Sequence, residues 1–369
     1  MKIVIVSNSF YPEISPRSFR TTELAKCLAN LNYEVLVLTN FHEETENFES
    51  NHNIKFSFFD PKKFPIIDFK SDTKLISFFN RALNFGLNYL FTYPDIELFF
   101  LVRRTMKRVN PKADLLISIA NPHQIHWGVA SVINQMSIKT WVADCGDPFM
   151  GQENNSFKPP FYFKWIEKYF CRKADFITVP TQDSVTAYYK EFTAKIKIIP
   201  QGFNFDEVEL FKGTLDKDMP VFAYSGSFIK NKRDPKELLE FLKTIETDYE
   251  FHIYTHPTHF NYVLPYISDN DRIKVFSYVD RKILLYELSK MDFVVNFENV
   301  GVKQTPSKLI DYAILNKPIL SVKTGSLNEQ HVLQFLNKNY AETFKVEHPE
   351  NYRIENVVKS FLSLMSNGK

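Results

Sequence analysis

Short apolar runs alternate with amphipathic stretches along most of the chain. The first run, Met1 to Ser7, is almost uninterrupted, which is typical of a strand buried on both faces. A polar loop from Asn8 to Ser18 follows, then a stretch at 21–31 with apolar side chains on one helical face, and a second apolar run at 34–39. This order predicts a βαβ unit, whose crossover makes its two strands parallel.

The alternation continues in two series, separated by an acidic, Gly-containing stretch from Pro200 to about Pro220. Further strands are expected at 54–59, 114–119, 139–144, 175–179 and 195–199, and then at 221–225, 250–254, 272–276, 292–297 and 318–322. Helices are expected at 123–135, 161–172 and 182–191 and from Asp234 onward. We therefore expect an α/β fold of two doubly wound, Rossmann-like parallel-sheet domains, at 1–200 and 201–350, with a C-terminal helix at 351–369 that packs back on the first domain.

Composition removes several classes of protein. The 369 residues include 45 basic and 43 acidic side chains, a net charge of +2 that does not favour wrapping around nucleic acid. Cys27, Cys145 and Cys171 are far apart, which argues against a disulfide framework or a Cys-rich zinc site. No apolar run reaches the roughly 18–20 residues of a membrane span, and no signal peptide is evident. We expect a reduced, cytoplasmic protein.

Residues 61–112 do not fit the alternation. They carry ten basic and four acidic side chains, interleaved with many Phe and Tyr. This composition suits a helix in an anionic membrane interface, which would place the protein at the inner face of the plasma membrane. The alternative is an ordinary helical pair with its aromatic residues in the core. Neither stretch separates its apolar and basic residues cleanly onto two helix faces, which favours the ordinary helical pair.

The loop after the first strand excludes two common nucleotide folds. It contains no glycine, whereas a Rossmann dinucleotide site needs G-x-G-x-x-G there, and the chain has no GxxxxGK[ST] motif. An NAD or FAD enzyme and a P-loop NTPase are therefore disfavoured. Arg17 and Arg20 in this region either meet an anionic substrate or are solvated.

The second domain opens with a strand, a small turn at Gly226 and Ser227, and a basic cluster that includes Lys232 and Arg233. Cations near the carboxyl end of a strand can neutralise a diphosphate without a metal ion. The alternative is a solvated, Lys-rich turn. Pro235 suits the first position of the helix that follows.

A second anion site is expected where a helix begins near Lys308. Thr305 or Ser307 can cap this helix, and its first N–H groups can bind phosphate. Asp311, about one turn further on, can accept hydrogen bonds from a ribose diol. The alternative is a capped helix of the core.

Polar residues also follow two strands of the first domain. His123 and His126 either contact substrate or are buried structural histidines, and Asp144 and Asp147 either bind hydroxyl groups or stabilise a turn. A zinc site at the histidines would need further ligands, and no nearby Cys or Glu has suitable spacing. The D-x-D pattern at 269–271 has the sequence of a surface turn, so we expect no metal site.

Taken in order, these segments resemble the glycosyltransferase family 4 group, the group-1 type of glycosyl transferases, which has the GT-B fold. The segments that carry the resemblance are Lys2–Val6 with Tyr11-Pro12-Glu13, Arg20 with 23–28, 34–39, Asn121-Pro-His with His126, Trp141–Phe149, Ile199–Asn204, Arg233-x-Pro235 and Pro306–Tyr312. The resemblance implies two Rossmann-like domains that face each other across a cleft.

The resemblance also implies a reaction and assigns residues to it. A sugar moves from a nucleotide-diphosphate donor, usually with retained configuration and without an essential metal or other cofactor, to a saccharide or lipid-linked acceptor. The expected catalytic residues are Arg233, helped by Lys232, and His126 or His123. The donor-binding residues it implies are Gly226, Ser227, Thr305, Ser307, Lys308, Leu309 and Asp311, and the acceptor-side residues are Arg17, Arg20, Asp144 and Asp147.

The chain departs from the family pattern at several positions. Lys303 stands where the first Glu of the E-x7-E motif is expected, Gly146 replaces an Arg, and Ser227 replaces a basic residue. The resulting prediction is a hexosyltransferase of surface polysaccharide, lipopolysaccharide or capsule synthesis. A GT-B nucleotide-sugar epimerase and a catalytically silent nucleotide-sugar-binding or scaffold subunit remain as alternatives.

Overall fold

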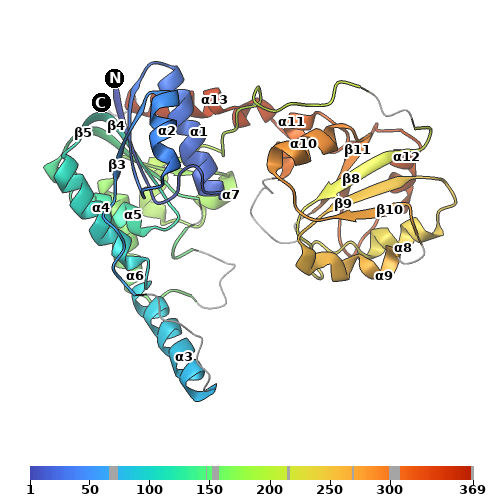
Figure 1. Cartoon of the computed structure of the whole chain (residues 1–369), viewed down its shortest axis with the longest axis horizontal. Coiled ribbons are helices and arrows are strands. Elements are labelled where there is room, and N and C mark those ends of the chain that lie inside the picture. The colour runs from blue at the N-terminus through green and yellow to red at the C-terminus, as the bar shows by residue number, and fades with distance from the viewer. Residues whose placement is uncertain are drawn as a thin grey trace. The chain divides into compact units, whose positions relative to one another are not determined.

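The protein was analysed as a computed structural model that describes residues 1–65, 74–146, 148–151, 158–213, 217–267, 270–298 and 308–366. The chain divides into two compact units (Figure 1). The first unit combines Met1–Phe203 with Asn351–Lys369, and the second is Asn204–Glu350. The division lies close to the predicted boundary at residue 200, and the C-terminal segment belongs to the first unit.

The first unit is built on a parallel sheet of seven strands in the order β3-β2-β1-β4-β5-β6-β7. Val4 of β1 pairs with Leu36 on one side and Leu116 on the other, so β1 lies inside the sheet, as its apolar sequence predicts. All seven strands lie where the apolar runs predict them. They are β1 (Lys2–Ser7), β2 (Glu34–Thr39), β3 (Ile54–Phe58), β4 (Lys112–Ile119), β5 (Ser137–Asp144), β6 (Phe176–Val179) and β7 (Ile196–Ile198).

The helices of the first unit follow the βα alternation, with three differences from prediction. Its first helix begins at Pro16 rather than near residue 21, because the Ser15 hydroxyl accepts the Ser18 N–H and Pro16 occupies the first turn. The predicted helix at 182–191 is reduced to one turn, and the predicted helix at 123–135 ends at Ala130. The helices are α1 (Pro16–Asn30), α2 (Glu44–His52), α3 (Lys74–Phe91), α4 (Ile96–Val109), α5 (Gln124–Ala130), α6 (Phe163–Lys173), α7 (Gln182–Val185) and α13 (Ile354–Ser366).

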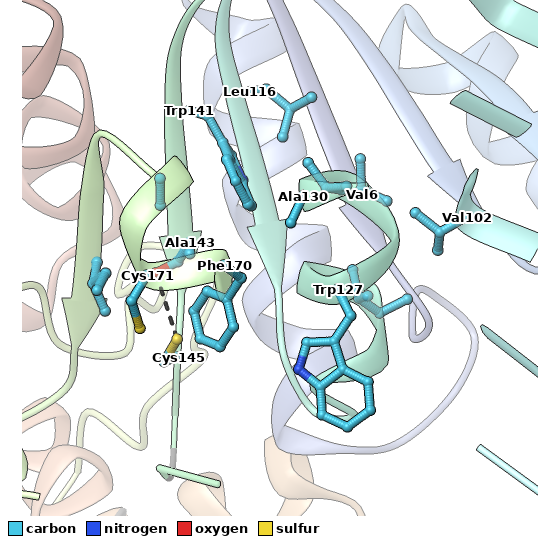
Figure 2. Close-up of a cluster of buried hydrophobic side chains, with 14 of the residues drawn as sticks. Val6, Val102, Leu116, Trp127, Ala130, Trp141, Ala143, Cys145, Phe170 and Cys171 are labelled. Carbon is cyan, nitrogen blue, oxygen red and sulfur yellow. Dashed lines mark hydrogen bonds between the residues drawn. The ribbon is translucent and has the colours of Figure 1, made fainter. Parts of the chain in front are cut away.

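Both faces of the seven-stranded sheet are covered. On one face, Phe361 and Val358 of α13 join the core that Leu24 and Leu28 of α1 form with Ile5 of β1. The other core contains Trp127, Trp141, Phe170, Cys145 and Cys171, which Figure 2 shows gathered between β5, α5 and the neighbouring elements. These cores fix the carboxyl ends of β1, β4 and β5, where the candidate residues lie.

The second unit has a parallel sheet of five strands in the order β10-β9-β8-β11-β12. Phe222 in its centre stacks on Phe251 and Phe293, with ring centroids 4.5 Å from each. The five strands also lie where they are predicted. The elements are β8 (Val221–Ser225), β9 (Glu250–Tyr254), β10 (Ile273–Phe276), β11 (Phe293–Phe297), β12 (Ile319–Val322), α8 (Lys236–Thr244), α9 (Leu264–Ile267), α10 (Arg281–Ser289), α11 (Lys308–Leu315) and α12 (Glu329–Leu336).

Helix α3 differs from the ordinary helical pair that the sequence favours. None of its side chains from Ile76 to Phe91 is buried, and Phe78 and Phe79 are about two-thirds exposed, at 66% and 63%. The expectation of core aromatic residues is therefore wrong for α3, which projects from the rest of the first unit (Figure 1). Among the described residues, no helix combines the length and the apolar character that crossing a membrane requires.

Candidate active site

The turn after β8 brings the backbone of Gly226 against a side chain from α11. A Cβ on Gly226 would lie 1.1 Å from the Lys308 Nζ, so only glycine leaves room for this ammonium group. Gly226 also has a φ of +144°, which side-chain-bearing residues rarely adopt. The predicted small turn is thus a place where a strand end and a cation meet.

Lys308 lies in an environment that weakens its charge. Its Nζ donates a hydrogen bond to the Tyr224 hydroxyl at 3.1 Å and lies 4.6 Å from the centre of the Tyr224 ring. Burial and the positive charge of Arg233 lower the pKa of Lys308 to about 7, against the opposing charge of Asp311. A bound anion would oppose both causes and favour the charged form.

Arg233 contributes a second cation to this edge of the sheet. Its backbone N–H and C=O both bond to Ile229, at 2.8 and 3.0 Å, which closes the turn before α8. Its Nε is buried and has no hydrogen-bond partner among the residues that the structure describes. Lys232 beside it is exposed. A buried guanidinium N–H of this kind is suited to an anionic oxygen.

The loops after β9 and β10 support the same turn. The Thr255 hydroxyl donates to the carbonyl of Gly226 at 2.6 Å, and the Ser227 hydroxyl lies 2.9 Å from that of Tyr278. The His259 Nδ1 accepts the Phe228 N–H at 3.1 Å. The sequence gives no sign of these loop contacts, since only the fold brings three strand ends together.

Asp311 is held by an arginine that the sequence analysis missed. The Arg281 guanidinium donates from Nη2 and Nε to Asp311 Oδ1, at 2.5 and 3.0 Å. Burial raises the pKa of Asp311, and Arg281 opposes that effect. Arg281 follows Asp280, which caps α10, so its sequence context is that of an ordinary helix start. The described part of this edge therefore carries three cations, Arg233, Lys308 and Arg281, of which Arg281 is paired with Asp311.

Three other residues are predicted in the donor site, namely Thr305, Ser307 and Leu309. Thr305 and Ser307, like Lys303, lie outside the described residues. Helix α11 is described from Lys308 onward. The Leu309 side chain is buried in the core of the second unit, so its side chain packs inward rather than toward the turn.

In the first unit, Arg20 and Asp144 form an internal ion pair. Both are almost completely buried, and Arg20 donates from Nε and Nη2 to the two carboxylate oxygens at 2.8 and 2.7 Å. Arg20 also donates to the carbonyls of Ile199 and Pro200. Burial works to raise the pKa of Asp144, but Arg20 holds it below its usual value. The alternative that Arg20 is solvated is therefore wrong. Its hydrogen bonds join the end of β5 to the segment after β7.

Arg17 occupies the space that a side chain at residue 146 would fill. A Cβ on Gly146 would lie 1.3 Å from the Arg17 Nη2. A guanidinium from α1 therefore lies directly beside residue 146, the position at which the resembled family pattern has an arginine. Arg17 is half-buried at the carboxyl edge of the sheet, and Asp147 lies outside the described residues.

His123 and His126 are inside the first unit, at 2% and 0% exposure. The His126 Nδ1 lies 2.8 Å from the Ser118 hydroxyl, which accepts the Trp141 indole N–H. Its Nε2 lies 3.4 Å from the Cys145 thiol. Burial, together with His123, lowers the pKa of His126 and keeps it neutral. This placement matches the structural alternative and leaves neither side chain exposed surface for a substrate.

The fold brings Cys145 to these histidines although the sequence spacing gives no sign of it. One ligand atom from each of His123, His126 and Cys145 lies within 4.8 Å of the others. Ser118 and Cys145 already partner both ring nitrogens of His126. Burial raises the pKa of the Cys145 thiol, so its contact with His126 is one between two neutral groups. Asn270, in the predicted turn at 269–271, donates to the Tyr249 hydroxyl, and Asp269 is not described.

Comparison with solved structures identifies this architecture. A glycosyltransferase from Rickettsia africae superimposes with a TM-score of 0.59 at 12% identity, over 99% of this chain and 93% of its own. The lipopolysaccharide outer core galactosyltransferase WaaB gives 0.59 at 12% identity, over 100% and 99%. The fold is GT-B. The predicted fold class is thereby confirmed.

Other GT-B structures resemble the chain to a similar degree. Anabaena Alr3699/HepE, solved with UDP, gives a TM-score of 0.58 at 13% identity over 100% and 98% of the two chains. The UDP-GlcNAc 2-epimerase of Methanocaldococcus jannaschii gives 0.56 at 12% identity over 100% of both. No protein-family description and no curated protein sequence matches the chain. Membership of family 4 therefore stays a prediction.

Proposed function

We propose that this GT-B protein is a glycosyltransferase that uses a nucleotide-diphosphate sugar. The observation that carries the proposal is a pair of cations at the carboxyl edge of the second sheet: Lys308, which lies against Gly226, and Arg233, whose charge acts on Lys308. Open parallel sheets bind ligands at this edge, and a diphosphate is the anion that two such cations suit. Similar GT-B structures bound to UDP and UDP-glucose support the choice of ligand class.

In the proposed reaction, an acceptor hydroxyl attacks the anomeric carbon as the bond to the diphosphate breaks. Arg233 and Lys308 stabilise the negative charge that develops on the departing nucleoside diphosphate, with Lys232 beside them. An oxygen of the leaving phosphate takes the proton of the acceptor, so that attack and departure share one face and the configuration is retained. No step needs a metal ion, because protein cations supply the charge.

The acceptor is proposed to be a saccharide or a lipid-linked sugar of a surface polysaccharide, lipopolysaccharide or capsule. We place the reaction in the cytoplasm, at the inner face of the plasma membrane for a lipid-linked acceptor. Arg17 is the acceptor-side residue that best suits this role, because it is half-buried at the carboxyl edge of the first sheet.

The test begins with a thermal-shift panel of UDP-, GDP-, ADP- and CMP-linked sugars, since a ligand of the native state raises its melting temperature. Transfer or hydrolysis is then measured with the sugar that binds. Arg233→Ala should remain folded and lose about 10²–10³ of turnover, while Lys236→Ala, on the exposed face of α8, serves as the matched control. Near-normal turnover of Arg233→Ala rejects its role.

An epimerase is the second candidate, because UDP-GlcNAc 2-epimerases share the fold to a similar degree. Incubation with the bound nucleotide sugar and no acceptor separates the two reactions. A new nucleotide-sugar epimer indicates an epimerase, whereas transfer only after an acceptor is added indicates the transferase. Binding with neither reaction would make the protein a nucleotide-sugar-binding subunit.

A further inference from the structure

Helix α3 presents a wide apolar face whose large side chains, among them Phe78, Phe79 and Leu83, are more than half exposed. Its polar side chains recur every third or fourth residue, at Ser77, Asn80, Arg81, Asn84 and Asn88, and so form one narrow stripe. The rest of its circumference carries Ile, Leu, Phe and Tyr, and none of the side chains from 76 to 91 is buried. In the sequence, the apolar and polar residues of α3 look intermixed because the apolar face of the helix is much wider than the polar one.

The start of α6 extends this face. The Tyr162 hydroxyl donates to the carbonyl of Leu90, which joins the start of α6 to the end of α3. Beside it, Phe161 is 73% exposed and Trp165 is 64% exposed, with ring centroids 5.6 Å apart. We call the apolar side chains of α3 together with Phe161 and Trp165 the aromatic face. Single exposed apolar residues are ordinary, but a continuous set of this size indicates a binding surface.

Charge identifies the class of partner. Neither the segment 74–94 nor the segment 158–166 contains an Asp or Glu, whereas Arg81, Lys158 and Lys164 are exposed within them. Exposed Phe, Tyr and Trp accompanied by these cations match the boundary between the headgroups and the acyl chains of an anionic bilayer.

The basic residues of α4 contribute less than their number suggests. Arg104 and Arg108 both donate to Asp60, at 3.1 and 2.6 Å. Asp60 therefore neutralises part of the charge of these two arginines. The cations beside the exposed aromatic rings are the ones expected to act on a membrane.

We propose that the aromatic face inserts into the interfacial layer of an anionic membrane, with the polar stripe of α3 turned toward water. The proposal rests on the proposed function in one respect, since a transferase held there would meet a lipid-linked acceptor at the bilayer. The membrane contact itself can be tested without a donor and without an acceptor.

The experiment is flotation of the full-length protein with vesicles of phosphatidylcholine and phosphatidylglycerol. Phe79→Ser with Leu83→Ser should lower the partition coefficient about a hundredfold, since each buried side chain contributes roughly a factor of ten. Ser77→Asn with Asn84→Ser, on the polar stripe of the same helix, is the matched control and should float like the wild type. Neither pair involves a buried side chain, so thermal unfolding should be unchanged in both.

Three results would overturn the proposal. The first is equal binding to vesicles of phosphatidylcholine alone, which would remove the role of charge. The second is flotation that survives Phe79→Ser with Leu83→Ser. The third is a dimer in solution that these substitutions dissolve, without any flotation, which would make a second copy the partner. If flotation behaves as expected but no nucleotide sugar binds, the proposed function fails and this inference stands.

Discussion

The lowered pKa of Lys308 makes a prediction about donor binding. A diphosphate needs the charged ammonium, but burial and Arg233 lower the pKa of Lys308 to about 7 in the free protein. The charged fraction falls from about nine-tenths at pH 6 to about one-tenth at pH 8. A bound diphosphate should raise this pKa again, so binding above pH 7 must be accompanied by uptake of a proton.

The direction of the effect follows from this linkage. Affinity should be fully present below about pH 7 and be lost as the pH rises, by about tenfold between pH 6 and pH 8. Titration calorimetry with UDP-glucose measures it, because both phosphates of a nucleotide sugar stay ionised over this range. Repeating the titration in buffers of different ionisation enthalpy counts the proton that is taken up.

Lys308→Met is the decisive comparison. This variant should bind weakly at every pH and show no proton uptake, because the titrating ammonium is gone. Lys236→Met, on the exposed face of α8, should keep the wild-type profile. The reasoning is refuted if Lys308→Met retains the tenfold loss between pH 6 and pH 8, since another group would then be titrating.

Three further outcomes are expected. Arg20→Met should lower the free energy of unfolding by about 3–5 kcal/mol in urea, because it leaves Asp144 as an unpaired buried charge; a loss below 1 kcal/mol would contradict the ion pair. Gly226→Ala should displace Lys308 and weaken nucleotide-sugar binding at least tenfold in calorimetry while leaving the fold intact, and unchanged affinity would show that the close approach is unimportant. Dialysis against EDTA should leave transfer activity unchanged, whereas activity restored only by Mg²⁺ would reject the metal-independent mechanism.

The strands were predictable because they are buried on both faces. Apolar runs such as 34–39 and 221–225 coincide with β2 and β8 at both ends, since short apolar runs are typical of strands inside a parallel sheet. Helix boundaries were less predictable. Pro16 looks like a loop residue in the sequence but occupies the first turn of α1, where a missing N–H has no cost.

The candidate site was only partly predictable, because several of its contacts cross the fold. Gly226 and Arg233 carry a local signal, a small turn followed by cations. Arg281 pairs with Asp311 from another helix, and its own neighbours along the chain give no sign of this. The same holds for Arg17, which reaches Gly146 from α1. Sequence spacing indicates residue types at strand ends, but not which ends meet.

The cations at the carboxyl edges of the two sheets differ in how the protein pairs them. Arg20 in the first unit faces one carboxylate through two hydrogen bonds and two backbone carbonyls, so its charge is satisfied by the protein itself. In the second unit, Arg233 lowers the pKa of Lys308, and Asp311 is already bound by Arg281. A site in which two cations repel each other is less stable when empty, and a bound anion removes that repulsion. Donor binding should therefore stabilise the second unit more strongly than the first, which hydrogen exchange with and without nucleotide sugar can measure for each unit separately.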